Sequence, residues 1–488
     1  MEIPLGAAER EPARPAILLR FAEGVDLVEP GADAGRLVLR TARRELALAD
    51  PGPGIAAAFG RLAGAGATEE DLAALVLHSE GPAGLPVLYY QLAELAKRCL
   101  LSHRAIGEKG LLATASFASP FLACRPSQAD DRQVLVFSRF ACIRRAGGRM
   151  LVESPLSAVT VTLDDPRVGA LCLELATPRC PRELAAPAGS LSPAEREVAC
   201  SLLLSCRVLA AVDDAGQAGD EEDGPLAYWE FADLLMHGSS RLGRNGPASG
   251  GGIGGTLRFA GRRAPPPLSK PAMSEESVDL IRPDLDRLAR EDLSLTAALE
   301  ERRSRRGFGD PPLTLPQLGE FLYRTARQRR AFTGESGQEL GSRPYPGGGA
   351  VYELEIYLSV SACGGLAPGF YHYDPREHRL WKLASRPEAI AALLRDAAAA
   401  AMQPAAPQVL LTIAARFARV FWKYEGMGYA LILKDVGVLY QTMYLVAEAM
   451  GLGACALGVG NADLFAAAAG VDYHAESSVG ELILGSRA

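Results

Sequence analysis

The stretch Phe421–Gly458, FWKYEGMGYALILKDVGVLYQTMYLVAEAMGLGACALG, is the part of the sequence that decides the fold. In its second half, apolar residues recur every three or four positions, which is the spacing of one helix face. The residues on this face are Val436, Leu439, Tyr440, Met443, Val446 and Met450. Gly451 is of the residue type that commonly ends a helix. A helix this apolar belongs in the middle of a domain.

Lys423 and Tyr424 stand just ahead of that helix, so we expect both side chains beside a hydrophobic core. Titratable groups held against apolar walls can have shifted pKa values, and proteins make catalytic acids and bases in this way. A surface lysine beside a half-buried tyrosine is the alternative that these two residues leave open.

The composition is that of a globular protein without nucleic-acid partners. Its 488 residues suffice for roughly three domains. A hydrophobic content of 48% and a net charge of −7 offer no basic face for phosphate backbones. The sequence has no long apolar run and no N-terminal signal pattern, so we expect a cytoplasmic protein that does not bind membranes. Nine cysteines without a C-x-x-C pair and six scattered histidines predict reduced thiols and no metal site.

The N-terminal half repeats one order of elements. After a polar tail (1–14), strand-like segments and then helices occur in residues 15–113, and the same order returns in residues 114–212. A helix-capping pattern occurs in each copy, at Thr68 and at Ser192. We therefore predict two small α+β modules of the winged-helix type.

The predicted modules lack a basic recognition helix, which disfavours DNA binding. Modules of this kind can instead capture a peptide as an added strand at the edge of the sheet. The alternative is that both modules are structural spacers or dimerisation elements.

Residues 213–275 form a predicted linker and connector arm. The segment from Asp213 is acidic, contains glycine and has almost no apolar side chains. Gly250–Gly255 resembles a phosphate loop only in its glycines, because no strand precedes it and no Lys-Ser or Lys-Thr follows. We interpret it as a flexible connector, and Pro265–Pro267 as a stiff extended arm into the domain of residues 276–488.

A basic cluster opens the C-terminal domain. Four arginines surround Ser304 in the segment 302–306, at the end of a predicted helix. Guanidinium groups beside a hydroxyl can hold a phosphate; a solvated basic face is the alternative. Further on, Gly347–Gly349 precede the predicted strand Val351–Val360, and glycines there let a flat ligand approach the backbone.

Six motifs follow one another in this half: ERRSRRGF, LTLPQLGEFLYRTARQRR, RPYPGGGAVYELEIYL, GLAPGFYHYDP, WKYEG and GLGACALG. Together they resemble the SagB-type dehydrogenases, the peptide azoline oxidase branch of the FMN-dependent nitroreductase superfamily. WEFADLLMHGSSRLGR also resembles the segment ahead of that catalytic domain, so the resemblance covers about Tyr228–Ala488. Two modules ahead of an oxidase domain are similar in layout to the oxidases of cyanobactin-type pathways.

The resemblance implies an α+β fold with a mostly antiparallel sheet flanked by helices. It also implies a homodimer whose FMN sites lie at the subunit interface. It assigns the FMN phosphate to Arg302, Ser304 and Arg306, with Arg487 near the C-terminus as a further candidate. It places Gly347, Gly348 and Gly349 along the flavin, and Leu457 and Gly458 at the flavin ring.

The sequence departs from the family pattern at two places. Gly347 stands where the family usually has a serine, and Gly458-Val459-Gly460 stands where it has Gly-Gly-Phe. Both departures favour one alternative, a noncatalytic scaffold that holds the precursor peptide and the cyclising enzyme together.

The Lys-Tyr pair of the azoline oxidases falls on Lys423 and Tyr424. Oxidising a thiazoline or oxazoline to its azole removes a hydride from the ring CH₂ and a proton from the carbon on the ring nitrogen. A positioned base must take that proton. A neighbouring ammonium can lower the pKa of a phenol, and a desolvated lysine can itself be neutral, so either residue could be the base.

The resemblance thus predicts an FMN-dependent dehydrogenase of azolines in a ribosomally synthesised, cyclodehydrated precursor peptide. Its expected partners are that precursor peptide and the cyclodehydratase. An oxidase of carrier-bound nonribosomal heterocycles and a generic nitroreductase are further alternatives. The Lys423–Tyr424 pair and the long N-terminal extension speak against the generic nitroreductase.

Overall fold

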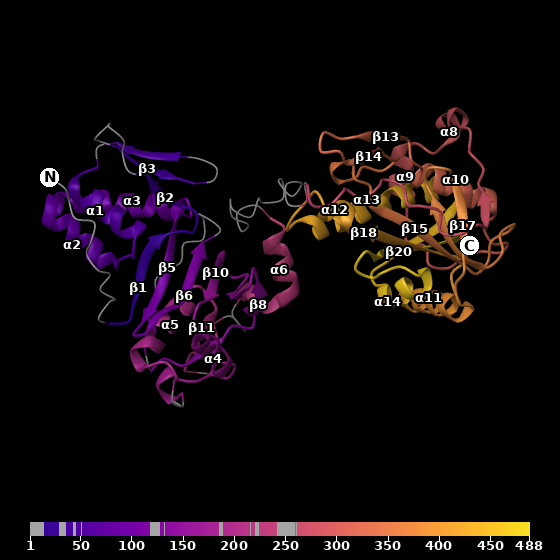
Figure 1. Cartoon of the computed structure of the whole chain (residues 1–488). Coiled ribbons are helices and arrows are strands. Elements are labelled where there is room, and N and C mark those ends of the chain that lie inside the picture. The colour runs from indigo at the N-terminus through magenta and orange to yellow at the C-terminus, as the bar shows by residue number, and fades with distance from the viewer. Residues whose placement is uncertain are drawn as a thin grey trace. The chain divides into compact units, whose positions relative to one another are not determined.

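The structure is a computed structural model (Figure 1). It describes residues 14–28, 36–41, 45–49, 51–117, 127–130, 132–184, 189–214, 216–219, 224–241, 259 and 261–488. The chain divides into two compact units, residues 1–251 and 252–488, and each is described by itself. Residues 1–13 of the predicted tail and the glycine run 250–255 lie outside the described residues, so the flexible connector stays a prediction.

A six-stranded antiparallel sheet organises the N-terminal unit. In spatial order its strands are β1 (Ala16–Phe21), β5 (Leu101–Gly107), β6 (Gly110–Phe117), β10 (Val159–Leu163), β9 (Arg149–Glu153) and β8 (Cys142–Ala146). β6 pairs with β5 on one side and with β10 on the other. The boundary predicted between residues 113 and 114 therefore lies inside β6. The two predicted winged-helix-like modules share one sheet instead of each having its own.

Strands β5 and β6 were not predicted, because only helices were expected to follow the first strands in residues 15–113. The observed helix α3 (Leu85–Lys97) ends before Leu101, which begins β5. Both strands mix alanine, serine, glycine and histidine with few β-branched residues, so they lack the alternation that indicates a strand. Tertiary context decides here, because β1 and β10 provide partners on both sides.

The remaining elements of this unit gather into two cores. The first contains α1 (Pro53–Ala63), α2 (Glu69–Glu80), α3 and the sheet β2 (Asp26–Val28), β3 (Arg36–Arg40) and β4 (Glu45–Ala49). The second contains α4 (Pro166–Glu174), α5 (Pro193–Ser205), the six-stranded sheet and the pair β7 (Leu135–Phe137) and β11 (Leu209–Ala211). The capping boxes predicted at Thr68 and Ser192 are confirmed. Helix α6 (Phe231–Ser239) follows.

The C-terminal unit is built on a seven-stranded sheet in which all neighbouring strands are antiparallel. In spatial order its strands are β12 (Ser277–Asp279), β17 (Arg379–Leu383), β16 (Gly369–Asp374), β15 (Leu354–Val360), β18 (Val409–Arg416), β20 (Glu476–Ser486) and β19 (Leu452–Leu457). Every residue of β15 is buried. The predicted α+β class with a mostly antiparallel sheet is confirmed.

Helices cover both faces of this sheet. Side chains of α10 (Leu315–Ala326) and α13 (Gly428–Ala449) share one core with alternate residues of β15 and β18. Side chains of α11 (Pro387–Ala400) and α14 (Ala462–Ala469) pack on the other face. The shorter elements are α8 (Leu285–Glu291), α9 (Leu295–Glu301), α12 (Phe417–Phe421) and the hairpin β13 (Arg330–Thr333) and β14 (Glu339–Ser342).

Helix α13 is the central helix that the sequence predicts, although it starts eight residues earlier than the periodic segment, at Gly428 instead of Val436. Its buried apolar face includes Ile432, Val436, Leu439 and Met443. Met450 caps it and Gly451 follows with a φ of 66°. Among the described residues it is the one helix long and apolar enough to cross a membrane. Because it packs against the sheet and α10, we interpret it as the core helix of this domain.

The connector arm is fixed to the C-terminal unit at α12. Arg419 is fully buried and donates hydrogen bonds to the carbonyl oxygens of Pro266 (2.7 Å), Glu339 (2.8 Å) and Val351. The Trp422 indole donates to the carbonyl of Arg263 at 3.1 Å. The arm therefore contacts the turn that immediately precedes Lys423 and Tyr424.

Replacing Arg419 by alanine should destabilise the C-terminal unit by about 3–5 kcal/mol, because three carbonyl groups lose their donor in a buried place. Urea unfolding followed by tryptophan fluorescence measures this, since Trp381 and Trp422, two of the three tryptophans, lie in this unit. Arg376→Ala is the control: its side chain is 64% exposed and pairs with Glu377, so we expect a change within about 0.5 kcal/mol. Equal effects of the two substitutions would contradict the proposed anchoring role.

Candidate cofactor and catalytic site

The predicted phosphate-binding residues gather at the C-terminal end of α13. The chain after α9 runs along β19, where the Arg305 amide donates to the Ala454 carbonyl at 2.9 Å. Ser304 Oγ lies 3.1 Å from Tyr444 Oη, and the Arg302 guanidinium lies 5.2 Å from the centre of the Tyr444 ring. The Tyr444 oxygen also accepts a hydrogen bond from the Ala456 amide at 2.7 Å. Tyr444 thus links the basic segment to the end of β19.

Glu448, one helical turn beyond Tyr444, forms ion pairs with two further arginines. Its buried carboxylate lies 3.1 Å from Arg487 Nη1 and 3.6 Å from Arg305 Nη2. A backbone bridge between Phe308 and Arg487 brings the last strand beside the basic segment. Arg302, Arg305 and Arg487 form an arginine cluster around Tyr444 and Glu448. Because Glu448 carries one charge and faces two of the guanidinium groups, the cluster keeps an excess of positive charge that suits an anion.

Sequence reasoning named Arg306 in this segment and did not name Arg305. In the structure Arg305 is half-buried against Glu448, whereas Arg306 is exposed. Tyr444 and Glu448 were also missed, because they lie far away in the sequence. Their four-residue spacing on α13 was the available signal, since residues four apart share one helix face.

A cavity of about 370 Å³ lies along the same side of α13. Predicted ring contacts Leu457 and Gly458 line it, together with Tyr440, one turn ahead of Tyr444. Glu481 also lines it and was not predicted. The Glu481 side chain is 3% exposed and its Oε1 has no hydrogen-bond partner. Burial, and then the charge of Asp396, raise the pKa of Glu481 to about 7.

The two departures from the family pattern have a steric reason. A Cβ at Gly347 would lie 3.1 Å from the Tyr352 ring, so the ring crowds the place where the family has serine. A Cβ at Gly460 would collide with the Glu481 carboxylate, so a side chain there would require that carboxylate to move. Both glycines therefore accommodate large neighbours of this chain, which weakens the argument for a degenerate site.

Lys423 and Tyr424 lie together in the turn between α12 and α13, beside the glycine segment, Gly347–Gly349. Lys423 Nζ donates to the Gly349 carbonyl at 3.2 Å and lies 5.5 Å from the centre of the Tyr424 ring. A Cβ at Gly349 would collide with Tyr424 Oη, and Gly349 has a φ of 60°. Only glycine fits this position without strain and leaves room for the pair.

Asp435, on α13, is hydrogen-bonded to the glycine segment. Both of its carboxylate oxygens accept from the Gly348 amide, at 2.9 and 3.1 Å. Burial, and then the charge of Asp435, raise the pKa of Tyr424. This direction is opposite to the lowered phenol pKa that the sequence analysis considered for Tyr424 beside an ammonium.

The glycine segment and the arginine cluster lie on opposite sides of α13. Asp435 and Tyr444 are nine residues apart, which is about 2.5 turns, so their side chains point in opposite directions about 13 Å apart along the axis. The helix itself separates the two groups. Within this chain, Lys423 and Tyr424 therefore do not share a face with the arginine cluster and the Leu457–Gly458 cavity.

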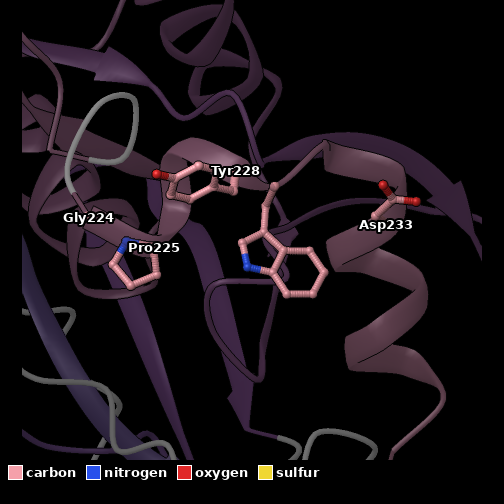
Figure 2. Close-up of a pocket in the computed structure, with 5 residues that line it drawn as sticks. Gly224, Pro225, Tyr228 and Asp233 are labelled. Atoms are coloured by element: carbon pink, nitrogen blue, oxygen red, sulfur yellow. The ribbon is translucent and has the colours of Figure 1, made fainter.

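Another cavity, of about 900 Å³, belongs to the N-terminal unit (Figure 2). Figure 2 shows Pro225 and Tyr228 on one side of it and Asp233 on the helix that follows. Tyr228 is 92% exposed. Arg139 holds the carbonyls of Leu226 and Trp229 at 2.8 and 3.1 Å. No residue of this cavity was predicted as a site residue.

In the part of the chain that the structure describes, no group of histidine, cysteine or acidic side chains could hold a metal ion.

Two family models match the chain. Residues 135–246 match the model of the cyanobactin oxidase ThcOx, and residues 299–486 match the nitroreductase family. A nitroreductase-type protein of Methanocaldococcus jannaschii is 31% identical over 183 residues, which cover 38% of this chain and 85% of that protein. The microcin B17-processing protein McbC of Escherichia coli is 29% identical over 115 residues, which cover 22% of this chain and 42% of McbC.

Solved structures with a similar fold include a nitroreductase-type protein of Ralstonia eutropha, with 22% identity and a TM-score of 0.34 over 46% of this chain and 96% of that one. The Escherichia coli microcin synthetase McbBCD complex with truncated pro-MccB17 bound contains a chain with 19% identity and a TM-score of 0.32, over 45% and 89% of the two chains. Both TM-scores are below 0.5, so family membership rests on the sequence matches.

The resemblance to SagB-type dehydrogenases is confirmed by the order of the two family matches, a cyanobactin-oxidase segment followed by a nitroreductase domain. The seven-stranded sheet, the arginine cluster and the cavity beside Leu457 all lie in or next to the residues that the second model covers. The chain therefore belongs to the nitroreductase family of oxidoreductases.

Proposed function

We propose that the chain is an FMN-dependent dehydrogenase that converts thiazolines or oxazolines to thiazoles or oxazoles in a ribosomally synthesised, cyclodehydrated peptide. The observation that carries the proposal is the Lys423–Tyr424 pair, held against the glycine segment of a nitroreductase domain. The cyanobactin-oxidase segment ahead of it supports a peptide substrate. McbC, which matches part of this domain, processes the peptide microcin B17. The cyclodehydratase is the proposed protein partner.

The residues present fit FMN, which the nitroreductase family typically binds. Arg302, Ser304 and Arg487 would hold the phosphate, because their cluster carries excess positive charge. The cavity beside Leu457 and Gly458 would take the ring. Its unpartnered Glu481 oxygen is a group that a bound ring system can satisfy. FMN would supply the hydride acceptor of the reaction.

The Lys423–Tyr424 pair would handle the proton. Both side chains are half-buried, so a peptide can reach them while the core wall behind them limits water. The proton leaves the ring carbon attached to nitrogen, and one member of the pair takes it. Gly349 keeps the space in front of Tyr424 Oη free of a side chain.

The separation of the arginine cluster from the Lys423–Tyr424 pair supports a homodimer. Because α13 separates the arginine cluster from Lys423 and Tyr424, a bound cofactor held by one protomer would need these two residues from another copy. Exposed apolar residues occur on and near α13 at Phe421, Tyr429 and Leu433. A two-fold interface over this helix would bury them and complete two equivalent sites.

Loss of the arginine cluster should remove FMN. We expect Arg302→Gln combined with Arg487→Gln to weaken FMN binding about 10- to 100-fold, because two charge-assisted contacts to the phosphate are lost. The ratio of flavin absorbance near roughly 450 nm to protein absorbance measures occupancy. Arg376→Gln, an exposed arginine elsewhere in the unit, is the control and should keep full occupancy.

Loss of the Lys-Tyr pair should abolish turnover without loss of cofactor. Lys423→Ala and Tyr424→Phe are each expected to purify with bound yellow flavin and to leave azoline peptides unchanged. Mass spectrometry of the peptide checks this, because the wild-type reaction removes about 2 Da per ring. Full azole formation by both variants would rule out the proposed catalytic pair. A colourless wild-type protein would instead favour the scaffold alternative.

Subunit complementation tests the homodimer. Co-expression of Arg302→Gln/Arg487→Gln chains with Lys423→Ala/Tyr424→Phe chains, followed by purification through two different tags, yields the mixed dimer. One of its two sites should then be intact, which gives about half of the wild-type activity. If each site lay within one protomer, the mixed dimer would be as inactive as its parents.

A further inference from the structure

Asp435 is an unusual residue for the middle of an apolar helix. Its side chain is 6% exposed, and no ion pair to it occurs among the residues that the structure describes. Its two oxygens instead accept from the Gly348 amide. Carboxylates are rarely buried without a cation, since desolvation penalises the charge. A buried carboxylate of this kind, beside a candidate catalytic pair, points to a role in function.

A second carboxyl group lies against it. Glu353 is fully buried, and neither of its carboxylate oxygens has a hydrogen-bond partner. Burial, and then the charge of Asp435, raise the pKa of Glu353 to about 8, while Arg343 opposes the shift. The pKa of Asp435 is raised as well, mainly by burial, while Gly348, Glu353 and then Lys434 lower it. Two neighbouring carboxyl groups whose pKa values are both raised resist ionising together.

The segment that Asp435 holds is strained. Gly349, Ala350 and Tyr352 have φ values of 60°, 60° and 44°, a region that residues other than glycine avoid. Strain of this kind persists where the surroundings fix it, and it clusters at functional sites. Here the fixing contacts are Asp435 to the Gly348 amide, Lys423 Nζ to the Gly349 carbonyl, and Tyr352 Oη to the Tyr345 carbonyl at 3.0 Å.

We propose that Asp435, whose buried carboxylate accepts from the Gly348 amide, is a positioning residue for the Lys423–Tyr424 pair. It fixes the strained glycine segment on which the pair rests, and its negative charge adds to burial in opposing ionisation of the Tyr424 phenol. The proposal rests on the proposed function only in treating the pair as catalytic. The titratable and charged groups around it are Lys423 in the turn, Lys434 on α13, and Arg343 and Glu353 beside β15.

A neutral Tyr424 would act as a hydrogen-bond donor in the reaction and leave proton removal to Lys423. A phenol that keeps its proton can donate a hydrogen bond to the azoline nitrogen, which polarises the C=N bond and acidifies the neighbouring C–H. Lys423 is then the member of the pair that takes the proton. The C–H bond breaks, an N–H bond forms on Nζ, and the freed electron pair forms the ring double bond as the ring CH₂ gives up a hydride, for which FMN would supply the acceptor.

The test is the titration of Tyr424 in the full-length protein. Tyrosine labelled with ¹³C at Cζ gives an NMR signal that shifts on ionisation, and Tyr424→Phe identifies the signal of Tyr424. We expect Asp435→Asn, which preserves the shape of the side chain, to lower the midpoint by about one pH unit. Asp435→Glu should restore a midpoint close to that of the wild type. An unchanged midpoint in Asp435→Asn overturns the proposal.

Two further variants keep the test decisive. Glu388→Gln removes an exposed carboxylate from α11, on the other face of the sheet, and the Tyr424 midpoint should stay in place. Glu353→Gln removes the second carboxylate that ionises before the phenol does, so it should also lower the midpoint, by less than Asp435→Asn. If Asp435→Asn does not fold, an unchanged midpoint in Glu353→Gln overturns the proposal on its own.

The NMR measurement needs neither substrate nor turnover, so its outcome is separate from the proposed function. A lowered midpoint together with no azole formation by the wild type would refute the azoline reaction and leave the carboxyl pair as the group that sets the state of Tyr424. Azole formation with an unmoved midpoint would refute the positioning role alone.

Discussion

The packing of α13 against the antiparallel sheet is the constraint on which the rest of the C-terminal unit depends. The helix buries Ile432, Val436, Leu439 and Met443 in the main core, so its rotation about its own axis is fixed. Every polar residue of the helix then has a fixed direction. Tyr440, Tyr444 and Glu448 point to the side of the cavity and the arginine cluster, and Asp435 points to the glycine segment.

One apolar helix thus organises two chemically different surfaces. The side with Tyr444 is rich in arginine and suits an anion, whereas the side with Asp435 holds two buried carboxyl groups and a lysine-tyrosine pair. Glu448 belongs to the arginine cluster and pairs with two of its guanidinium groups, whereas Asp435 bonds the glycine segment on the other side of the helix. Residues on one side of the helix can therefore change without disturbing the contacts on the other.

The sequence predicts well those features that depend on local pattern. The α13 face, the capping boxes at Thr68 and Ser192, and the proximity of Lys423 to the helix start all follow from spacing over a few residues. It predicts poorly what depends on distant partners. Glu353, Glu448 and Glu481 look like ordinary acidic residues in the sequence, and only the fold brings each of them to a buried position beside α13 or the cavity. The shared six-stranded sheet of the N-terminal unit was missed for the same reason, since β6 is identified by its neighbours more than by its own residues.

The anchoring of the connector arm has a consequence for how this protein can be recombined with its relatives. By sequence, the linker extends to residue 275, which invites a fusion junction there. The arm from Arg263 to Lys270 nevertheless belongs to the oxidoreductase domain, because Arg416, Arg419 and Trp422 bond its carbonyls and Glu476 pairs with Lys270 at 2.6 Å. A chimera that exchanges the N-terminal unit should therefore keep this segment with the residues that follow it. Otherwise the exchange replaces the support of the turn that carries Lys423 and Tyr424, and a change in substrate choice could not be told apart from damage to that turn.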